Sequence, residues 1–202
     1  MSTTTAHTPP APGPTDHHVA PGRYTRVAMW LHWIIAGLIV TQLIGGFVMH
    51  KLPNTASFKI EAYQLHKSFG LVVLALALVR LGWRLTHKAP PLPEGTKTWE
   101  RLLARATHTA FYVLIIGVPL AGWWVVSSSS YGTGSFFFVA DIPVLPGAGI
   151  LSHGAWEEVH EIMAKLVIGL LVLHVAAALK HHYVDKDGVL ARMAPWVTRR
   201  TA

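Results

Sequence analysis

The chain has 202 residues and a mass of 22.1 kDa, enough for one domain. Hydrophobic residues make up 51% and charged residues only 13%, against about 25% charged in an average soluble domain, so a fully water-exposed surface is disfavoured. Cysteine is absent, which excludes disulfides, iron–sulfur clusters, Cys-ligated zinc and covalently attached c-type haem. In so apolar a chain, the net charge of +7 favours a membrane-surface charge bias over nucleic-acid binding.

The two ends of the chain are predicted to be tails. Residues 1–22 are rich in Thr, Pro, Ala and His and contain no apolar run, which is typical of a disordered, solvated segment. A weak metal-binding tract formed by His7, His17 and His18 is the alternative interpretation. No signal-peptide pattern opens the chain, and residues 198–202 form a short C-terminal tail.

Four apolar stretches lie between the tails, at about residues 27–48, 62–83, 106–126 and 157–179. As a helix, each of these stretches of about 20 residues would cross about 30 Å of hydrocarbon. An open sheet or a lipid-exposed loop would leave backbone polar groups unpaired there. The sequence therefore predicts an all-α fold, a four-helix transmembrane bundle occupying residues 23–197.

Charge predicts how the bundle is oriented. Of the 17 Lys and Arg residues, only Lys51, Lys59, Lys67 and Lys165 lie toward one side, while the other 13 lie near the termini and the second connection. The positive-inside rule places the richer side in the cytoplasm. Both termini are thus predicted to be cytoplasmic, as an even number of spans requires.

Histidines inside the spans are the main functional signal, because ionisable side chains are costly in a membrane and mark functional sites. His32 and His174 lie near the predicted cytoplasmic side, and His66 and His160 near the outer side. His160 and His174 are 14 residues apart, which is about 21 Å along a helix and about 40° short of whole turns. Two imidazoles on one helix face, each depth-matched to another histidine, suit two stacked bis-histidine haems.

Other interpretations of these histidines stay open. A buried histidine is often a hydrogen-bonded core residue, and His108 lies at the depth of His32 and His174, so it could replace one of them. Zinc is disfavoured because its four ligands must converge on one point. Small residues near the pairs, which would let a flat macrocycle approach the backbone, are Gly37, Gly70 and Gly169.

Several segments of the chain resemble the prokaryotic cytochrome b561 family. The resemblance covers about residues 23 to 197, and its segments are Met29–Trp33, Leu65–Gly70, Val79–Arg84, Val159–Glu161, Leu173–Tyr183 and Asp187–Met193. It implies a four-helix cytochrome of the bacterial inner membrane with two haem b groups. Carried over, His32 with His174 would bind the inner haem iron, and His66 with His160 the outer one.

The resemblance also implies a function. The first hypothesis is an enzyme that oxidises superoxide on the periplasmic side and reduces ubiquinone. The second is an electron-carrier subunit that links a periplasmic dehydrogenase or hydrogenase-like partner to the quinone pool. The third is a non-redox membrane scaffold with structural histidines.

Bis-histidine ligation leaves no open position on the iron and favours outer-sphere electron transfer, so no catalytic residue is predicted. The four outer lysines could attract a small anion such as superoxide. Acidic residues on the same side oppose this effect, namely Glu61, Asp141, Glu157, Glu158 and Glu161.

A quinone site is predicted at the cytoplasmic side. A quinone needs an apolar slot, hydrogen-bond donors for its carbonyl oxygens and a supply of protons. The ends of the second and fourth helices bring suitable side chains to this side, namely Arg80, Trp83, Arg84, His181 and His182. The alternatives are that these are ordinary positive-inside residues, or that the quinone site lies on the outer side.

Overall fold

The structure is a computed structural model, and it describes residues 22–93, 95–130 and 134–197. The predictions of two tails, at residues 1–22 and 198–202, fall outside the described residues except for Gly22.

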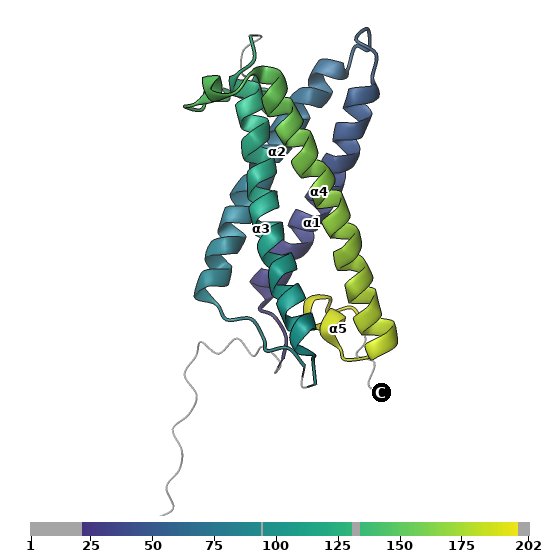
Figure 1. Ribbon diagram of the computed structural model, residues 1–202. Coiled ribbons are helices and arrows are strands. Elements are labelled where there is room, and N and C mark those ends of the chain that lie inside the picture. Colours follow the sequence, from purple (N-terminus) through teal and green to yellow (C-terminus); the bar gives the residue numbers. More distant parts are fainter. Residues whose placement is uncertain (1–21, 94, 131–133, 198–202) are drawn as a thin grey trace, which may run out of the picture.

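Four long helices form an up-and-down bundle, which confirms the all-α four-helix fold (Figure 1). They are α1 (Arg26–Lys51), α2 (Lys59–Thr86), α3 (Thr98–Ser127) and α4 (His153–Lys180). All four are long and apolar enough to cross a membrane. The start of α1, the α2–α3 connection and the end of α4 lie together at one end of the bundle. We call this the inner end and the opposite one the outer end, after the predicted orientation.

The helices extend beyond the predicted apolar stretches because polar residues start them. Thr25 caps α1 by accepting a hydrogen bond from the backbone N–H of Ala28, and Ser152 does the same for Ala155 in α4. The first turns of α3 carry Glu100, whose carboxylate accepts from the backbone N–H of Lys97. Hydropathy marks only the lipid-facing part of each helix, so these polar turns were not part of the predicted spans.

Helix packing in the bundle is sequential, and the core is thin. α1 packs on α2, α2 on α3, and α3 on α4, whereas α1 and α4 are not an extensively packed pair. The most deeply buried side chains of the helices are small, such as Ser68 and Ala77, both 0% exposed. Many large apolar side chains point outward, as in Trp30, Val113 and Leu173. An apolar exterior around small buried residues is what a lipid-embedded bundle requires.

The outer connection between α3 and α4 contains a hairpin that sequence analysis did not predict. Strand β1 (Ser135–Phe136) pairs antiparallel with β2 (Ala140–Asp141), and a 3₁₀ turn, η1 (Ala148–Ile150), follows. Phe137 and Phe138 in the turn have positive φ values of 45° and 64°, which is unusual for bulky residues. The backbone N–H of Phe137 donates to Ser68 Oγ at 2.8 Å, and this bond ties the hairpin to α2.

The chain after α4 folds back on the inner end. A short π-helix, η2 (His181–Asp185), extends α4, and a final helix, α5 (Val189–Met193), follows. Ala191 is completely buried. The indole of Trp33 in α1 donates to the carbonyl oxygen of Met193 at 2.9 Å, so α5 is fastened against the start of the bundle.

Candidate haem sites

The outer end of the bundle brings the rings of His66 of α2 and His160 of α4 close together. Their ring centroids are 6.3 Å apart, and the ring planes meet at 81°. These two residues are 94 positions apart in the sequence, and they meet because α2 and α4 both start at the outer end of the bundle.

The inner end brings three histidines together. His32 of α1 and His174 of α4 have ring centroids 6.2 Å apart with their planes at 63°. His108 of α3 lies on another side of His174, at 5.9 Å, and the ring of Phe111 is 5.2 Å from His174. Ring distance alone therefore leaves His108 as an alternative partner of His174.

Both ring separations fit a shared metal ion. An imidazole nitrogen lies about 2 Å from a bound metal, and the ring centre lies roughly 1 Å beyond that nitrogen. Two imidazoles on opposite sides of one iron therefore have their centres about 6 Å apart. The separations of 6.3 Å and 6.2 Å agree with this value.

The second ring nitrogens of the outer pair are also informative. His160 Nδ1 lies 2.9 Å from the carbonyl oxygen of Val118, and because a carbonyl only accepts, Nδ1 must carry the proton. Nε2 then keeps a lone pair for a metal, the arrangement usual for metal-bound histidine. His66 Nδ1 is buried and has no hydrogen-bond partner among the described residues. A buried ring nitrogen without a partner is uncommon, so His66 is open to a group that the described residues do not supply.

The second nitrogen of His32 has a different neighbour. Its Nδ1 lies 3.4 Å from a guanidinium nitrogen of Arg80, whose other terminal nitrogen donates to the carbonyl oxygen of Ala28 at 2.7 Å. A guanidinium can only donate, so when His32 Nδ1 carries its proton this 3.4 Å approach is no hydrogen bond. His32 Nδ1 then faces a cation, whereas His160 Nδ1 faces an acceptor.

The glycines predicted near the pairs have open surroundings. A Cβ added at Gly37 or Gly169 would meet no protein atom within 4 Å, and one at Gly70 would lie 3.5 Å from Gln42 Nε2. Two further glycines were missed by sequence analysis. A Cβ at Gly122 would lie 3.0 Å from His160 Cε1, and one at Gly46 would lie 3.6 Å from His66 Cε1. Sequence analysis looked for glycines near a histidine of the same helix. Gly122 and Gly46 each lie against a histidine of another helix, so that search could not find them.

Gln42 is another residue whose role at the site was not predicted. Its side-chain amide donates to the backbone carbonyl oxygen of His66 at 2.8 Å. This bond joins α1 to α2 at the level of the outer pair. Its polarity inside an apolar stretch was the available signal, since a buried amide in a membrane needs a partner.

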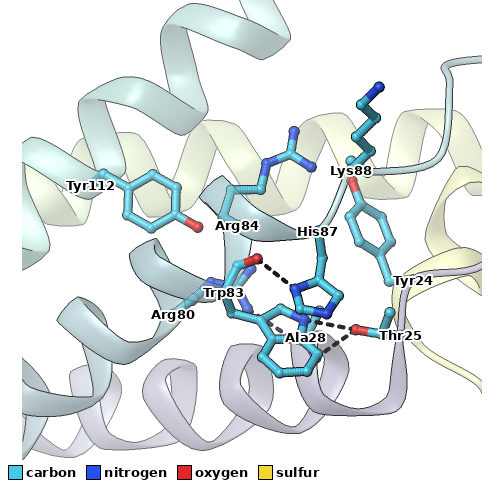
Figure 2. A pocket seen from close by; sticks show the side chains of 10 residues that line it. Tyr24, Thr25, Ala28, Arg80, Trp83, Arg84, His87, Lys88 and Tyr112 are labelled. Carbon is cyan, nitrogen blue, oxygen red and sulfur yellow. Dashed lines mark hydrogen bonds between the residues drawn. The ribbon is translucent and has the colours of Figure 1, made fainter.

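The predicted quinone residues divide into two groups in the structure. Arg80, Trp83 and Arg84 line one cleft at the inner end, together with Tyr24, Thr25, Ala28, His87, Lys88, Ala89 and Tyr112 (Figure 2). The Trp83 indole donates to Thr25 Oγ1 at 3.0 Å and stacks on His87 with ring centroids 3.7 Å apart. In Figure 2 the Tyr112 hydroxyl points toward the arginines. The cleft therefore combines aromatic walls with fixed positive charge.

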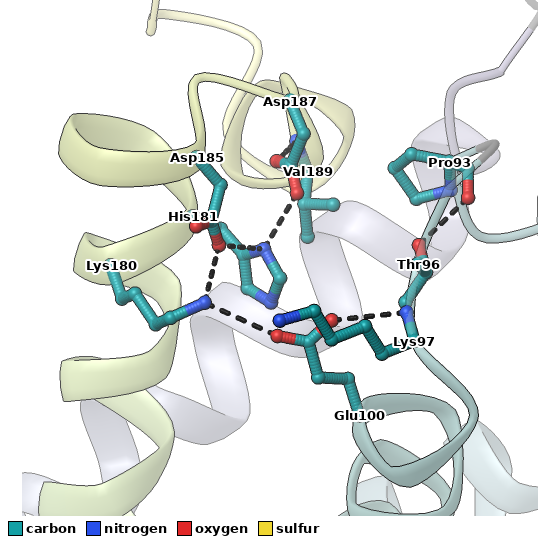
Figure 3. Close-up of polar contacts among 9 residues, drawn as sticks. All are labelled: Pro93, Thr96, Lys97, Glu100, Lys180, His181, Asp185, Asp187 and Val189. Atoms are coloured by element: carbon teal, nitrogen blue, oxygen red, sulfur yellow. Dashed lines mark hydrogen bonds and ion pairs between the residues drawn. The ribbon is translucent and has the colours of Figure 1, made fainter.

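His181 and His182 are not among the residues that line this cleft. His181 Nδ1 lies 2.6 Å from Asp187 and 3.1 Å from Asp185 (Figure 3). Asp185 also accepts from Lys180 at 2.7 Å. The ring of His182 contacts Tyr183 instead. The two arginines thus line the same cleft, whereas the two histidines lie outside it and contact other residues.

Two of the four outer lysines have close partners. Lys165 forms an ion pair with Glu161 at 2.6 Å, and Lys59 donates to the carbonyl oxygen of Leu52 at 2.8 Å. These contacts hold both ammonium groups against the protein, and the Glu161 carboxylate offsets the charge of Lys165. The positive electrostatic potential that could attract an anion at the outer end is therefore weaker.

The four apolar helices indicate an integral membrane protein, in which histidines of different helices meet at two levels. A profile of the prokaryotic cytochrome b561 family matches residues 23–196. The chain belongs to this family, which confirms the resemblance found in the sequence. Membership implies a membrane electron-transfer protein that binds haem b.

Curated relatives cover most of the chain. Cytochrome b561 homolog 2 of Escherichia coli is 33% identical over 175 residues, which are 86% of this chain and 92% of that protein. Cytochrome b562 of Cereibacter sphaeroides is 32% identical over 84% of this chain and 94% of its own. The probable superoxide oxidase CybB of Yersinia pestis is 25% identical over 86% of this chain and 96% of its own.

Proposed function

We propose that the chain is a di-haem cytochrome b of the bacterial inner membrane, with both termini in the cytoplasm. His66 with His160 binds the outer haem, and His32 with His174 binds the inner one. The observation that carries this proposal is the pair of ring separations, 6.3 Å and 6.2 Å, at two levels of one helix. When bound, the haems supply one-electron transfer, while the protein supplies ligands, orientation and charge.

The choice of His32 over His108 rests on helix packing. α3 and α4 pack directly on each other, whereas α1 and α4 are not extensively packed. A flat macrocycle between His108 and His174 would push apart two packed helices. Between His32 and His174 it meets less protein, because α1 and α4 are not extensively packed.

The proposed activity is oxidation of superoxide at the outer side and reduction of ubiquinone. A relative named a probable superoxide oxidase supports it. Saturated bis-histidine ligation also favours electron exchange over oxygen binding at iron. The proposed quinone site is the inner cleft, where Arg80 and Arg84 offer donors for a carbonyl oxygen and Trp83 offers an aromatic wall.

An electron-carrier role is the second candidate. It is favoured by the higher identities to proteins named only as cytochromes, 33% and 32% against 25%, and by the ion pair that engages Lys165. Under this proposal a periplasmic dehydrogenase or hydrogenase-like partner supplies the electrons, and the quinone pool receives them.

Two measurements on the purified protein test these proposals. A pyridine haemochrome assay should return two b haems per chain, and one or none would contradict the di-haem proposal. Superoxide generated enzymatically should then reduce the haems, and added short-chain ubiquinone should reoxidise them, with superoxide dismutase as the control. Haem reduction that dismutase does not abolish would contradict superoxide as the donor and leave the carrier role.

A further inference from the structure

The two histidine pairs differ in what faces their second ring nitrogens, and we infer that this difference sets the direction of electron flow. The inner haem has the higher reduction potential, so an electron moves from the outer haem to the inner one. The inference rests on the ligand pairs proposed above and adds an order of potentials to them.

At the outer pair, a backbone carbonyl accepts a hydrogen bond from a proposed ligand. The Val118 carbonyl accepts from His160 Nδ1 at 2.9 Å, and such a bond raises the basicity of the metal-binding nitrogen. A more basic ligand stabilises the ferric state and lowers the reduction potential. The contact depends on the local sequence of α3, because Gly122, one turn after Val118, lets the His160 ring come within 3.0 Å of a position that any other residue would fill with its Cβ.

At the inner pair, a fixed cation takes the place of the acceptor. The Arg80 guanidinium is always protonated, and it lies 3.4 Å from His32 Nδ1. Its positive charge also acts on the rings of His174 and His108. A positive charge in a low-dielectric site disfavours the ferric haem, which carries one charge more than the ferrous haem. The bond from Arg80 to the Ala28 carbonyl, at 2.7 Å, holds the guanidinium in this place.

No comparable cation acts on the outer pair among the described residues. Neither outer imidazole has a cation at its Nδ1: that of His66 has no hydrogen-bond partner among the described residues, and that of His160 has the Val118 carbonyl. Lys67 follows His66 directly, but neighbouring residues on a helix point about 100° apart. Hydrogen bonding and charge therefore act in the same sense, lowering the outer potential and raising the inner one.

The transfer is a one-electron exchange. With haem bound at both pairs, the outer site would be oxidised by one electron as the inner site is reduced by one, and no bond or proton would move. This order delivers electrons to the end of the bundle that contains the Arg80 and Arg84 cleft.

An equilibrium redox titration of the holoprotein, followed by absorbance, tests the inference without measuring activity. A His66→Ala variant that keeps a single haem identifies the inner potential. We expect the inner haem to favour the electron by at least tenfold, which is 59 mV for a one-electron couple. Equal potentials, or a higher outer potential, would overturn the inference, whereas a single haem in the unmodified protein would overturn the proposed function.

Two further variants test the named causes. Arg80→Gln should lower the inner potential by a tenfold or larger change in equilibrium constant and leave the outer one in place, while Arg80→Lys, which keeps the charge, should change it less. If Arg80→Gln loses haem, Gly122→Ala provides the test at the other end, because displacing the His160 ring from Val118 should raise the outer potential alone. An inner potential unmoved by Arg80→Gln, or an outer potential unmoved by Gly122→Ala, would contradict the assigned cause.

Discussion

The outer and inner ends of the bundle place histidines on α4 in the same way but surround them differently. At the outer end, the indoles of Trp123, Trp124 and Trp156 donate to carbonyl oxygens of the α3–α4 connection. Phe137 of the hairpin packs edge-on against Phe69. Aromatic side chains and hydrogen-bonded loop backbone therefore cover this end.

The inner end is polar by comparison. Arg80 and Arg84 line a cleft there, and His181 lies against two carboxylates. Reduction of a quinone consumes protons as well as electrons, so a polar end with titratable groups suits that step. If the histidine pairs are ligands as proposed, the same ring separation is placed in two different surroundings, one aromatic and one polar and charged.

The largest expected effect comes from the ligands themselves. His160→Ala should remove the outer haem and leave the inner one spectrally intact, because the two pairs share only the α4 backbone. His108→Ala is the matched control, since it removes an inner-end histidine that is not a proposed ligand. Haem content by pyridine haemochrome checks both variants. Loss of the inner haem in His108→Ala would indicate that His108, and not His32, is the partner of His174.

The next effect concerns the inner cleft. Arg84→Ala should slow quinone reduction by about tenfold or more, as the loss of a charged hydrogen bond of 1.5–3 kcal/mol implies, with both haems retained. His182→Ala should leave the rate unchanged because His182 lies outside the cleft. Stopped-flow reoxidation of the reduced protein by a short-chain quinone measures both. Equal rates in Arg84→Ala and the unmodified protein would contradict the proposal that the quinone binds in this cleft.

A smaller effect is expected where the hairpin is tied to the outer end. Ser68 is fully buried; its hydroxyl accepts from the Phe137 N–H and donates to the Gln64 carbonyl, both at 2.8 Å. Ser68→Ala leaves that N–H unpaired, at a cost of about 1–3 kcal/mol. The thermal unfolding midpoint of the detergent-solubilised protein should fall. Thr86→Val is the control, because the Thr86 hydroxyl bonds, among the described residues, only to its own helix and to the adjacent His87, and an equal loss there would contradict the role of Ser68.

The smallest effect is expected at Gln42. Gln42→Leu removes the bond to the His66 carbonyl, and interhelical hydrogen bonds in membranes contribute about 0.6 kcal/mol on average. We expect a slight loss of stability and faster release of the outer haem on heating, measured from the Soret band. Thr41→Val, whose hydroxyl donates to Gly37 of the same helix, should change neither. Faster release of the inner haem alone would show that Gln42 does not act on the outer pair.

The sequence by itself determined the four membrane-spanning helices, the family and the candidate ligand pairs. Apolar stretches of about 20 residues leave a helix as the only way to pair the backbone in lipid. The helical period then places His160 and His174, 14 residues apart, on one face of the fourth helix. Ligand pairing remains a proposal, but the histidines on which it depends are visible without a structure.

Only the tertiary structure decided what surrounds each histidine. The carbonyl that faces His160 comes from α3, the guanidinium that faces His32 comes from α2, and His181 turns to Asp187 through a π-helical turn. The positive φ values of Phe137 and Phe138 also depend on the contact of their turn with α2. Local propensity and hydropathy describe one segment at a time, whereas these contacts depend on which helix faces meet and at what height.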